Sequence, residues 1–398
     1  MILSLGLILL VGMSLASIFK KIGLPAIIGM LLTGIILGPE LLNLIDKNTL
    51  AISSDLRTIA LIVILLKAGL SLDISDLKRV GTSAVLLSFL PASFEILAYA
   101  IFAPMVLGLN LIDGLLMGAV MGAVSPAIVV PRMVKLIDEG YGKDKSIPQM
   151  ILAGASCDDV FVLVLFSSFL SMAKGGSFSA GSLIKVPISI ILGIGVGILI
   201  GFLLYYFFEM KFKKGAYIRN SSKVIIILGI SFLLVSMEGL LKNLVPISGL
   251  LAVIAMASSY KIKATDALVS RLSDKFAKLW IFAEVLLFVL VGAEVDIKYM
   301  TEVGFYGIIL IFLGLIIRAI GVFIAVGFSD LNKKEKLFTI FSYMPKATVQ
   351  AAIGSVALAN GLSSGLAILS VAVLGILITA PLGAILIDKS YKKLLVRG

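Results

Sequence analysis

The sequence has no histidine, one cysteine and one tryptophan among its 398 residues, and only 14% of the residues are charged. Without histidine, and with Cys157 alone, disulfide scaffolds and zinc or haem sites built from Cys and His are excluded. An ordinary soluble domain is about one quarter charged. The 60% apolar content and the mean hydropathy of +1.15 therefore exclude a soluble globular enzyme and predict an integral membrane protein.

Apolar runs fill almost the whole chain. A helix needs about 20 apolar residues to cross the hydrocarbon of a bilayer, and polar breaks divide this sequence into about 13 such runs. The predicted fold is thus all-α and polytopic, with about 13 transmembrane helices joined by short loops. The runs lie near residues 2–19, 23–45, 57–73, 82–108, 111–136, 147–173, 182–209, 223–241, 244–260, 277–297, 303–328, 336–361 and 364–388.

Basic residues are distributed unequally between the loops. Of the 34 Lys and Arg residues, 25 follow odd-numbered runs or lie at the C-terminal end, and 6 lie in the opposite loops. Cytoplasmic loops collect Lys and Arg. We therefore expect a protein of the cytoplasmic membrane, with its N-terminus outside the cell and its C-terminus in the cytoplasm. The net charge of +11 then reflects topology, and no nucleic-acid partner is expected. The basic, amphipathic residues 261–278 are expected to lie along the cytoplasmic surface.

Three pairs of segments repeat in the same order. Residues 65–74 match 288–297 at an offset of 223, residues 20–29 resemble 241–249, and residues 122–130 resemble 342–350. Equivalent helices are seven spans apart and so run in opposite directions, which is the inverted-repeat design of secondary transporters. The predicted domains are a first six-helix repeat (1–173), a linker helix (174–221), a second, inverted six-helix repeat (222–388) and a short cytoplasmic tail (389–398).

Prolines occupy equivalent places in the two repeats. Pro126 and Pro131 lie in one span, and Pro345 lies in its counterpart. Proline removes a backbone donor and clashes with the preceding turn, so each could simply kink its helix. The paired positions favour two discontinuous helices that cross at mid-membrane. Lys346 would then offset the negative dipole end of a half-helix.

Asp158 and Asp159 are adjacent in a long apolar span. Carboxylates at that depth are costly and functional by default, although buried partners could also satisfy them. A carboxylate is a hard oxygen ligand that can hold either a proton or an alkali cation. Competition at this pair would be enough to make an exchanger. Cys157 is expected to be a packing residue.

Glu95 and Arg318 each lie in the middle of an apolar span, and they are 223 residues apart, which is the repeat offset. Either charge alone would be costly in the membrane. We therefore expect an ion pair between the repeats, which either holds them in register or competes for Asp158.

These motifs resemble the monovalent cation/proton antiporter superfamily, in its double-aspartate branch, and are similar to the NHA-type sodium/proton exchangers. The resemblance runs from Leu61 to Asp388 and rests on GAVSPAIVVPRM, the aspartate pair, LVGAEVDI, and PKATVQAAIGSVAL followed by ILITAPLG. It implies 13 or 14 helices, a dimer domain and a core domain, a homodimer and elevator-like alternating access. It further implies that Asp159 is the main cation and proton ligand, with Asp158 as its companion and Ser125 and Ser156 as neighbours.

One position departs from the electrogenic bacterial members of that superfamily, which place a lysine where this chain has Arg318. An arginine does not readily deprotonate, so pairing with Glu95 is favoured and the stoichiometry stays open.

The resulting hypothesis is a homodimeric antiporter, not an enzyme, that exchanges Na⁺ or Li⁺ for H⁺ and uses no cofactor. Its partners would be the transported cation, the proton and membrane lipid. A K⁺/H⁺ antiporter of the same fold is the first alternative. A sodium-coupled organic-anion symporter is the second, although Lys346 and Arg318 are the only deep basic groups that could line its cavity. A membrane sensor would leave the aspartate pair unexplained.

Overall fold

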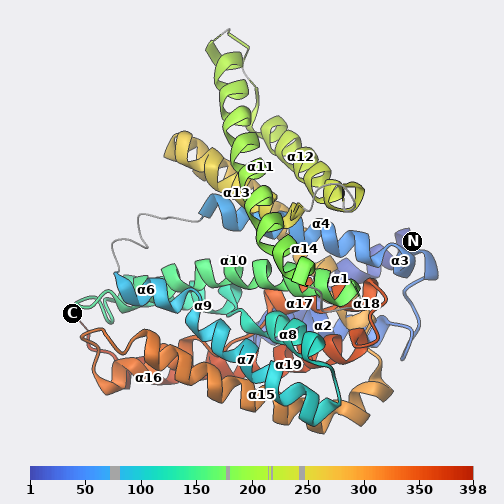
Figure 1. Cartoon of the computed structure of the whole chain (residues 1–398), viewed down its shortest axis with the longest axis vertical. Helices are drawn as coiled ribbons and strands as arrows, with labels where there is room; N and C mark the ends of the chain where they lie inside the picture. Colours follow the sequence, from blue (N-terminus) through green and yellow to red (C-terminus); the bar gives the residue numbers. More distant parts are fainter. Residues whose placement is uncertain (72–80, 176–179, 214, 217, 242–246, 398) are drawn as a thin grey trace. The chain divides into compact units, whose positions relative to one another are not determined.

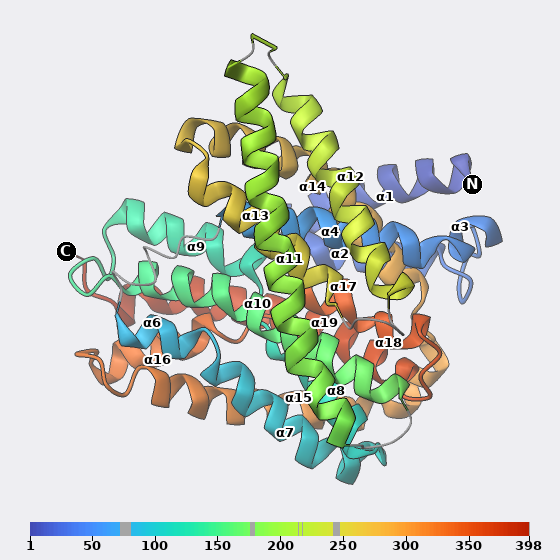
Figure 2. The ribbon, with the colours of Figure 1, turned by 45° about the horizontal axis from the view of Figure 1, so that its top comes forward.

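The computed structural model describes residues 1–71, 81–175, 180–213, 215–216, 218–241 and 247–397 (Figures 1 and 2). Within these ranges the regular elements are helices, apart from an isolated β-bridge between Tyr141 and Arg397. Nine helices of the described chain are long and apolar enough to cross a membrane. The predicted all-helical membrane fold is therefore confirmed. The count of 13 spans and the domain boundaries stay predictions.

The chain divides into two compact units. The first comprises residues 1–54, 73–174 and 287–398, and the second comprises residues 55–72 and 175–286. Each unit draws on residues from both predicted repeats, so the units are a different division of the chain from the repeats.

The first unit contains two unwound segments, the helices on either side of each segment, and the long helices that surround them. Within it, α7, α8 and α15 lie side by side, and α19 packs against α15, α16 and α17 (Figure 1). Its helices are α1 (Ile2–Lys21), α2 (Ala26–Leu37), α3 (Lys47–Ala51), α6 (Thr82–Leu87), α7 (Leu90–Leu107), α8 (Leu111–Gly122), α9 (Pro126–Glu139), α10 (Ile147–Lys174), α15 (Ile297–Ala325), α16 (Lys333–Ser342), α17 (Thr348–Gly354), α18 (Val356–Ala359) and α19 (Gly365–Leu394).

The second unit is a smaller bundle in which α13 packs against α11 and α12 (Figure 2). Most of α4 and α14 belongs to it as well. The helices are α4 (Ser53–Ser71), α11 (Ala180–Lys213), α12 (Asn220–Leu240), α13 (Gly249–Lys263) and α14 (Asp266–Ala293).

Residues 261–278, which were expected to lie along the cytoplasmic surface, do not form an element of their own. Helix α13 continues to Lys263, and α14 begins at Asp266 and runs unbroken to Ala293. No glycine or proline interrupts the sequence between Asp266 and Val291, so nothing ends the helix before the apolar span begins. Residues 266–278 are therefore the first half of α14.

Short polar side chains fix where several helices begin. Asn332 accepts from the backbone amides of Lys334 and Glu335, and the Glu335 carboxylate accepts in return from the Asn332 amide, which is a capping box at the start of α16. Asn110 accepts from the Asp113 amide at the start of α8, and Asp296 from the Tyr299 amide at the start of α15. These caps place the loops outside the apolar spans.

Two close helix contacts are related by the repeat offset. On α4, Gly69 lies so near the Ile254 carbonyl of α13 that a β-carbon there would be 2.8 Å from the oxygen. On α14, Gly292 approaches the Leu31 carbonyl of α2 still more closely. Gly69 and Gly292 differ by 223 residues, and so do Leu31 and Ile254.

A second pair of contacts has the same character. Gly29 of α2 packs on Leu15 of α1, and Gly249 of α13 packs on Val235 of α12. Gly29 and Gly249 are 220 residues apart in the sequence, and so are Leu15 and Val235. Parts of the repeated sequence (72–74 and 242–246) lie outside the described residues. The inverted repeat stays a prediction, and these matching contacts support it.

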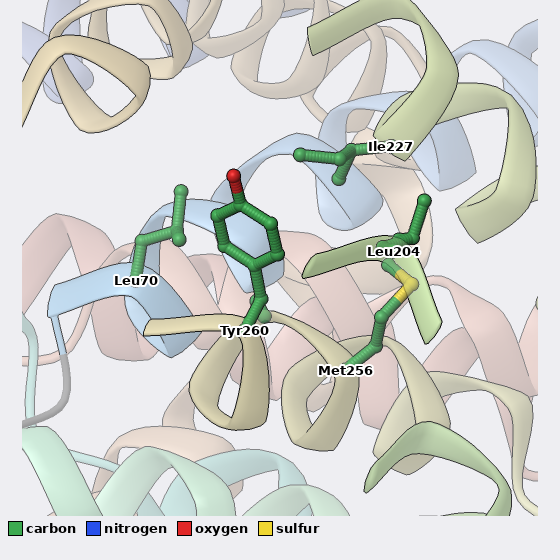
Figure 3. A pocket seen from close by; sticks show the side chains of 6 residues that line it. Leu70, Leu204, Ile227, Met256 and Tyr260 are labelled. Atoms are coloured by element: carbon green, nitrogen blue, oxygen red, sulfur yellow. The ribbon is translucent and has the colours of Figure 1, made fainter. Parts of the chain in front are cut away.

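The second unit encloses a small apolar cavity of about 10 Å³ (Figure 3). Leu70, Leu204, Ile227, Met256 and Tyr260 surround it, and the Tyr260 hydroxyl has no hydrogen-bond partner in the described part of the chain. Such a volume holds about one water molecule at most. The cavity is too small for an organic ligand.

Candidate functional site

Two extended segments meet inside the first unit. Residues 123–125 separate α8 from α9, and residues 344–347 separate the end of α16 from α17. The Ser125 amide donates to the Pro345 carbonyl over 2.8 Å, which joins the two segments directly. Pro126 is the first residue of α9, a position where the missing amide proton costs nothing. The structure thus places an interruption in each of the two spans in which paired prolines predict one.

Pro131 does not interrupt its helix, so its assignment as a helix break is wrong. Helix α9 runs through it from Pro126 to Glu139. A proline within a helix removes one hydrogen bond and need not end the helix when packing holds it. The interruption lies before Pro126 because residues 123–125 find partners outside their own helix.

Gln350 and Thr379 satisfy the backbone at this junction. The Gln350 side chain accepts from the Ala347 amide over 2.8 Å and donates to the Ala123 carbonyl over 2.9 Å, so that one amide group bridges both segments. The Thr379 hydroxyl of α19 accepts from the Lys346 amide over 2.9 Å. Unpaired backbone groups would be very costly in the membrane, and these side chains remove that cost.

Arg318 of α15 connects two buried carboxylates. Its Nη1 donates to Glu95 Oε2 over 2.7 Å, and its Nη2 donates to Asp158 Oδ2 over 3.0 Å. Nε donates to the Tyr343 carbonyl over 2.7 Å, and Nη1 also contacts the Gly122 carbonyl. The three charged side chains are at most 1% exposed. The structure therefore pairs Glu95 with Arg318 and also brings Asp158 to the same guanidinium.

Lys346 has a partner that the sequence analysis did not expect. Its ammonium lies 2.6 Å from Glu95 Oε2, the oxygen that also accepts from Arg318, and Lys346 is fully buried. The expectation was that the charge offsets a half-helix dipole. A carboxylate within hydrogen-bond distance is a far stronger partner than partial charges on carbonyls.

The aspartate pair lies beside the junction. Asp158 is fully buried, and its Oδ2 also accepts from the Val124 amide over 2.9 Å. Asp158 Oδ1, Asp159 Oδ1 and the Ser125 hydroxyl are buried atoms without a hydrogen-bond partner in the described part of the chain. Ser156 lies in the same helix, and its side chain is outside the described residues. The site thus offers oxygen ligands that the described protein does not satisfy.

The described residues contain no group of three or more His, Cys, Asp or Glu side chains that could hold a resident metal ion. The unpartnered atoms named above are carboxylate and hydroxyl oxygens. Such hard ligands suit a proton or an alkali cation better than a transition metal.

The sequence analysis missed Gln350, Thr379 and Tyr343. All three are fully buried polar residues. The signal that could have found Gln350 is its place four residues after Lys346, in a span otherwise made of apolar and small residues. Thr379 and Tyr343 carry no comparable signal, because both residue types are common in membrane helices.

Known proteins resemble this chain over nearly its full length. The family described as "Sodium/hydrogen exchanger, transmembrane" matches residues 6–388. Sodium/hydrogen exchanger 9B2 of Xenopus tropicalis is 38% identical over 357 residues, which are 87% of this chain and 65% of that relative. The human protein of the same name is 35% identical over 384 residues, 94% of this chain and 70% of its own length. The chain thus spans about two thirds of these relatives.

A solved structure also resembles this chain. The sodium proton antiporter MjNhaP1 from Methanocaldococcus jannaschii at pH 8 superposes with a TM-score of 0.83 at 25% identity, and covers 98% of this chain and 97% of its own. The match confirms the helical fold and the resemblance to the monovalent cation/proton antiporter superfamily. The chain is an integral, multi-pass membrane protein, and it belongs to the sodium/hydrogen exchanger family.

Proposed function

We propose that this chain exchanges Na⁺ or Li⁺ for H⁺ across the cytoplasmic membrane by alternating access, with cation and proton competing at Asp158 and Asp159. The proposal is supported by Asp158 Oδ1 and Asp159 Oδ1, two buried oxygens without a partner among the described residues, and by the contact of Asp158 with the unwound segment that meets Pro345 through Ser125. An anionic oxygen left unsatisfied at such depth is costly unless it binds a proton or a cation.

The charge balance of the cluster supports Asp159 as the exchanging group. Two cations, Arg318 and Lys346, contact two carboxylates, Glu95 and Asp158, so these four charges compensate one another. Asp159 is adjacent to this balanced set and adds one carboxylate to it. Its charge is neutralised by either a proton or a monovalent cation, and Asp158 Oδ1 and the Ser125 hydroxyl complete the ligands.

The proposal also predicts the stoichiometry of cation/proton exchange. If a single carboxylate exchanges one proton for one monovalent cation while the other four charges stay fixed, each cycle moves no net charge. Arg318 cannot supply a second proton because its guanidinium stays protonated in proteins. Exchange by this chain should therefore be insensitive to membrane potential, and proteoliposomes clamped at different potentials with K⁺ and valinomycin should give equal Na⁺-driven rates.

The experiment that tests the function uses proteoliposomes with an imposed pH gradient and a lumenal pH dye. Addition of Na⁺ or Li⁺ should dissipate the gradient in the wild type and not in Asp159→Asn. Asp158→Asn should reduce the rate less, because its carboxylate is partly occupied by Arg318. The matched control is Asp274→Asn, which removes an exposed carboxylate on α14 and should exchange at the wild-type rate.

The other readings give different results in the same assay. A response to K⁺ alone would indicate the K⁺/H⁺ antiporter. Silence with every cation, in protein shown to be folded and inserted, would reject exchange and favour a symporter or a sensor.

The proposal includes a homodimer with the N-terminus outside and the C-terminus in the cytoplasm. Cys157 is the only native cysteine, so single cysteines can report orientation in a Cys157→Ala background. Lys333→Cys should react with an impermeant reagent from the cytoplasmic side, and Lys298→Cys from the outside. The reverse pattern would refute the orientation. Mass measurement in detergent distinguishes a dimer from a monomer.

A further inference from the structure

A groove of about 240 Å³ runs between α16 and α19 in the first unit, where the two helices pack side by side (Figure 1). Leu337 and Phe341 line it from α16, and Ile385 lines it from α19. Leu337 and Ile385 are each 41% exposed. We call this feature, together with Lys389, Ser390 and Lys393 of α19, the α16–α19 groove.

One end of the groove is basic. Lys389 and Lys393 line it, are exposed, and lie four residues apart on one face of α19. No ion pair or hydrogen bond joins either ammonium to another described residue. The α16–α19 groove therefore has two positive charges without a described partner next to its apolar lining.

The nearest acidic residues in the two helices are occupied elsewhere. Asp388 precedes Lys389 but accepts from Arg132, with Nη2 and Oδ2 2.9 Å apart. Glu335 of α16 pairs with Lys145 over 2.8 Å and also closes its own capping box. Both carboxylates have other partners, so the two lysines of the groove keep their positive charge open to an anionic ligand.

The position along the helices fits a membrane interface. Lys389 and Lys393 lie in the last two turns of α19, and three further lysines occur in the first turn of α16: Lys333, Lys334 and Lys336. Both helix ends belong to the side that the basic loops identify as cytoplasmic. The apolar residues of the groove continue from there toward the middle of the spans.

We propose that the α16–α19 groove binds an anionic phospholipid of the cytoplasmic leaflet. One acyl chain lies along Leu337, Phe341 and Ile385, and the phosphate lies between the ammonium groups of Lys389 and Lys393. Basic pockets between membrane helices on this side attract anionic headgroups, and lysines reach the interface through their long apolar stems. The Ser390 side chain lines the same groove between the two lysines. This inference does not depend on the exchanged ion.

The test measures lipid retention by native mass spectrometry of the full chain in detergent, titrated with phosphatidylglycerol or with phosphatidylcholine of the same acyl chains. Wild type should retain one phosphatidylglycerol at concentrations where it retains no phosphatidylcholine. A lysine near a charged headgroup contributes about 1 kcal/mol, which converts to about a fivefold change in affinity. Lys389→Gln/Lys393→Gln should therefore weaken phosphatidylglycerol binding about 25-fold.

Two matched variants separate a specific site from general basicity. Lys392→Gln removes the same charge from the same helix, but Lys392 lies over the Tyr391 ring rather than in the groove, so binding should stay within about twofold. Ile385→Trp fills the channel without changing charge and should also weaken binding. Equal retention of both lipids would overturn the proposal, as would an equal effect of Lys392→Gln and Lys389→Gln. Free glycerol phosphate could also compete for the site while Ile385→Trp has no effect. That result would show an anion site that does not hold an acyl chain, and it would likewise refute the proposal.

Discussion

Arg318 donates from Nη2 to Asp158 Oδ2 over 3.0 Å, so the arginine at the repeat position of Glu95 is tied directly to the aspartate pair. The same guanidinium also holds Glu95 and the Tyr343 carbonyl. A planar fork with five donors can serve these acceptors at once, whereas an ammonium cannot.

Arg318→Lys should therefore behave as a severe substitution although it keeps the charge. We expect a loss of about 2 to 4 kcal/mol in stability, since buried acceptors are left unpaired, together with reduced Na⁺/H⁺ exchange. The control is Arg132→Lys, at a surface pair with Asp388 where the arginine is 23% and the aspartate 51% exposed. That change should cost less than about 1 kcal/mol. Equal melting temperatures for the two variants in detergent would contradict the assignment.

Glu95 compensates two cations, and its removal should be more damaging than the removal of both Glu95 and Lys346. Glu95→Gln leaves Arg318 and Lys346 with one charged acceptor, Asp158, and should cost about 3 to 5 kcal/mol. Glu95→Gln/Lys346→Met restores the balance of charge. The double variant should accordingly melt above Glu95→Gln alone. Strictly additive losses in a double-mutant cycle would show that the Lys346–Glu95 contact carries no coupling.

The sequence predicted the parts of this cluster that depend on chain-wide patterns. Apolar run length indicates membrane helices, and the repeat offset of 223 matches Glu95 with Arg318. Lone charges in apolar spans are costly, so a pairing could be inferred from charge alone.

Local geometry could not be predicted in the same way. The contact of Lys346 with Glu95 depends on the path of residues 344–347, which no pattern specifies. Pro131 and Pro126 look alike in sequence, yet only the segment before Pro126 finds partners in another helix and unwinds. Residues 261–278 likewise have the composition of a surface segment, yet from Asp266 onward they form one unbroken helix with the apolar span that follows.

Gly292 tests whether the repeat-related helix contacts stabilise the fold. A β-carbon there would overlap the Leu31 carbonyl of α2, and a backbone atom cannot move aside cheaply. We expect Gly292→Ala to destabilise the protein by about 1 to 3 kcal/mol. Gly229→Ala is the matched control in α12, where nothing lies within 4 Å of the added carbon, and it should be neutral or stabilising by up to about 1 kcal/mol. A melting temperature for Gly292→Ala at or above that of Gly229→Ala would contradict this packing.

Gly154 and Tyr343 give a test of the packing against the aspartate helix. Gly154 lies one turn before Asp158 in α10, and a β-carbon there would overlap the buried Tyr343 hydroxyl. The Tyr343 ring also packs beneath Arg318, with the guanidinium carbon 5.6 Å from the ring centre. Gly154→Ala should therefore displace Tyr343, disturb Arg318 and Asp158, and lower both the melting temperature and the exchange rate.

Tyr343→Phe removes the overlapping hydroxyl and should partly rescue Gly154→Ala. The rescue is incomplete because the new methyl group still lies 2.8 Å from the Leu87 side chain. In a double-mutant cycle, the combined variant should be less destabilised than the sum of the single variants by about 1 kcal/mol or more. The double variant should also regain part of the exchange rate that Gly154→Ala loses, because exchange and stability both depend on the position of Arg318 over the Tyr343 ring. A cycle with no coupling would mean that the two side chains do not meet, and the description of the helix surface next to Asp158 would have to change.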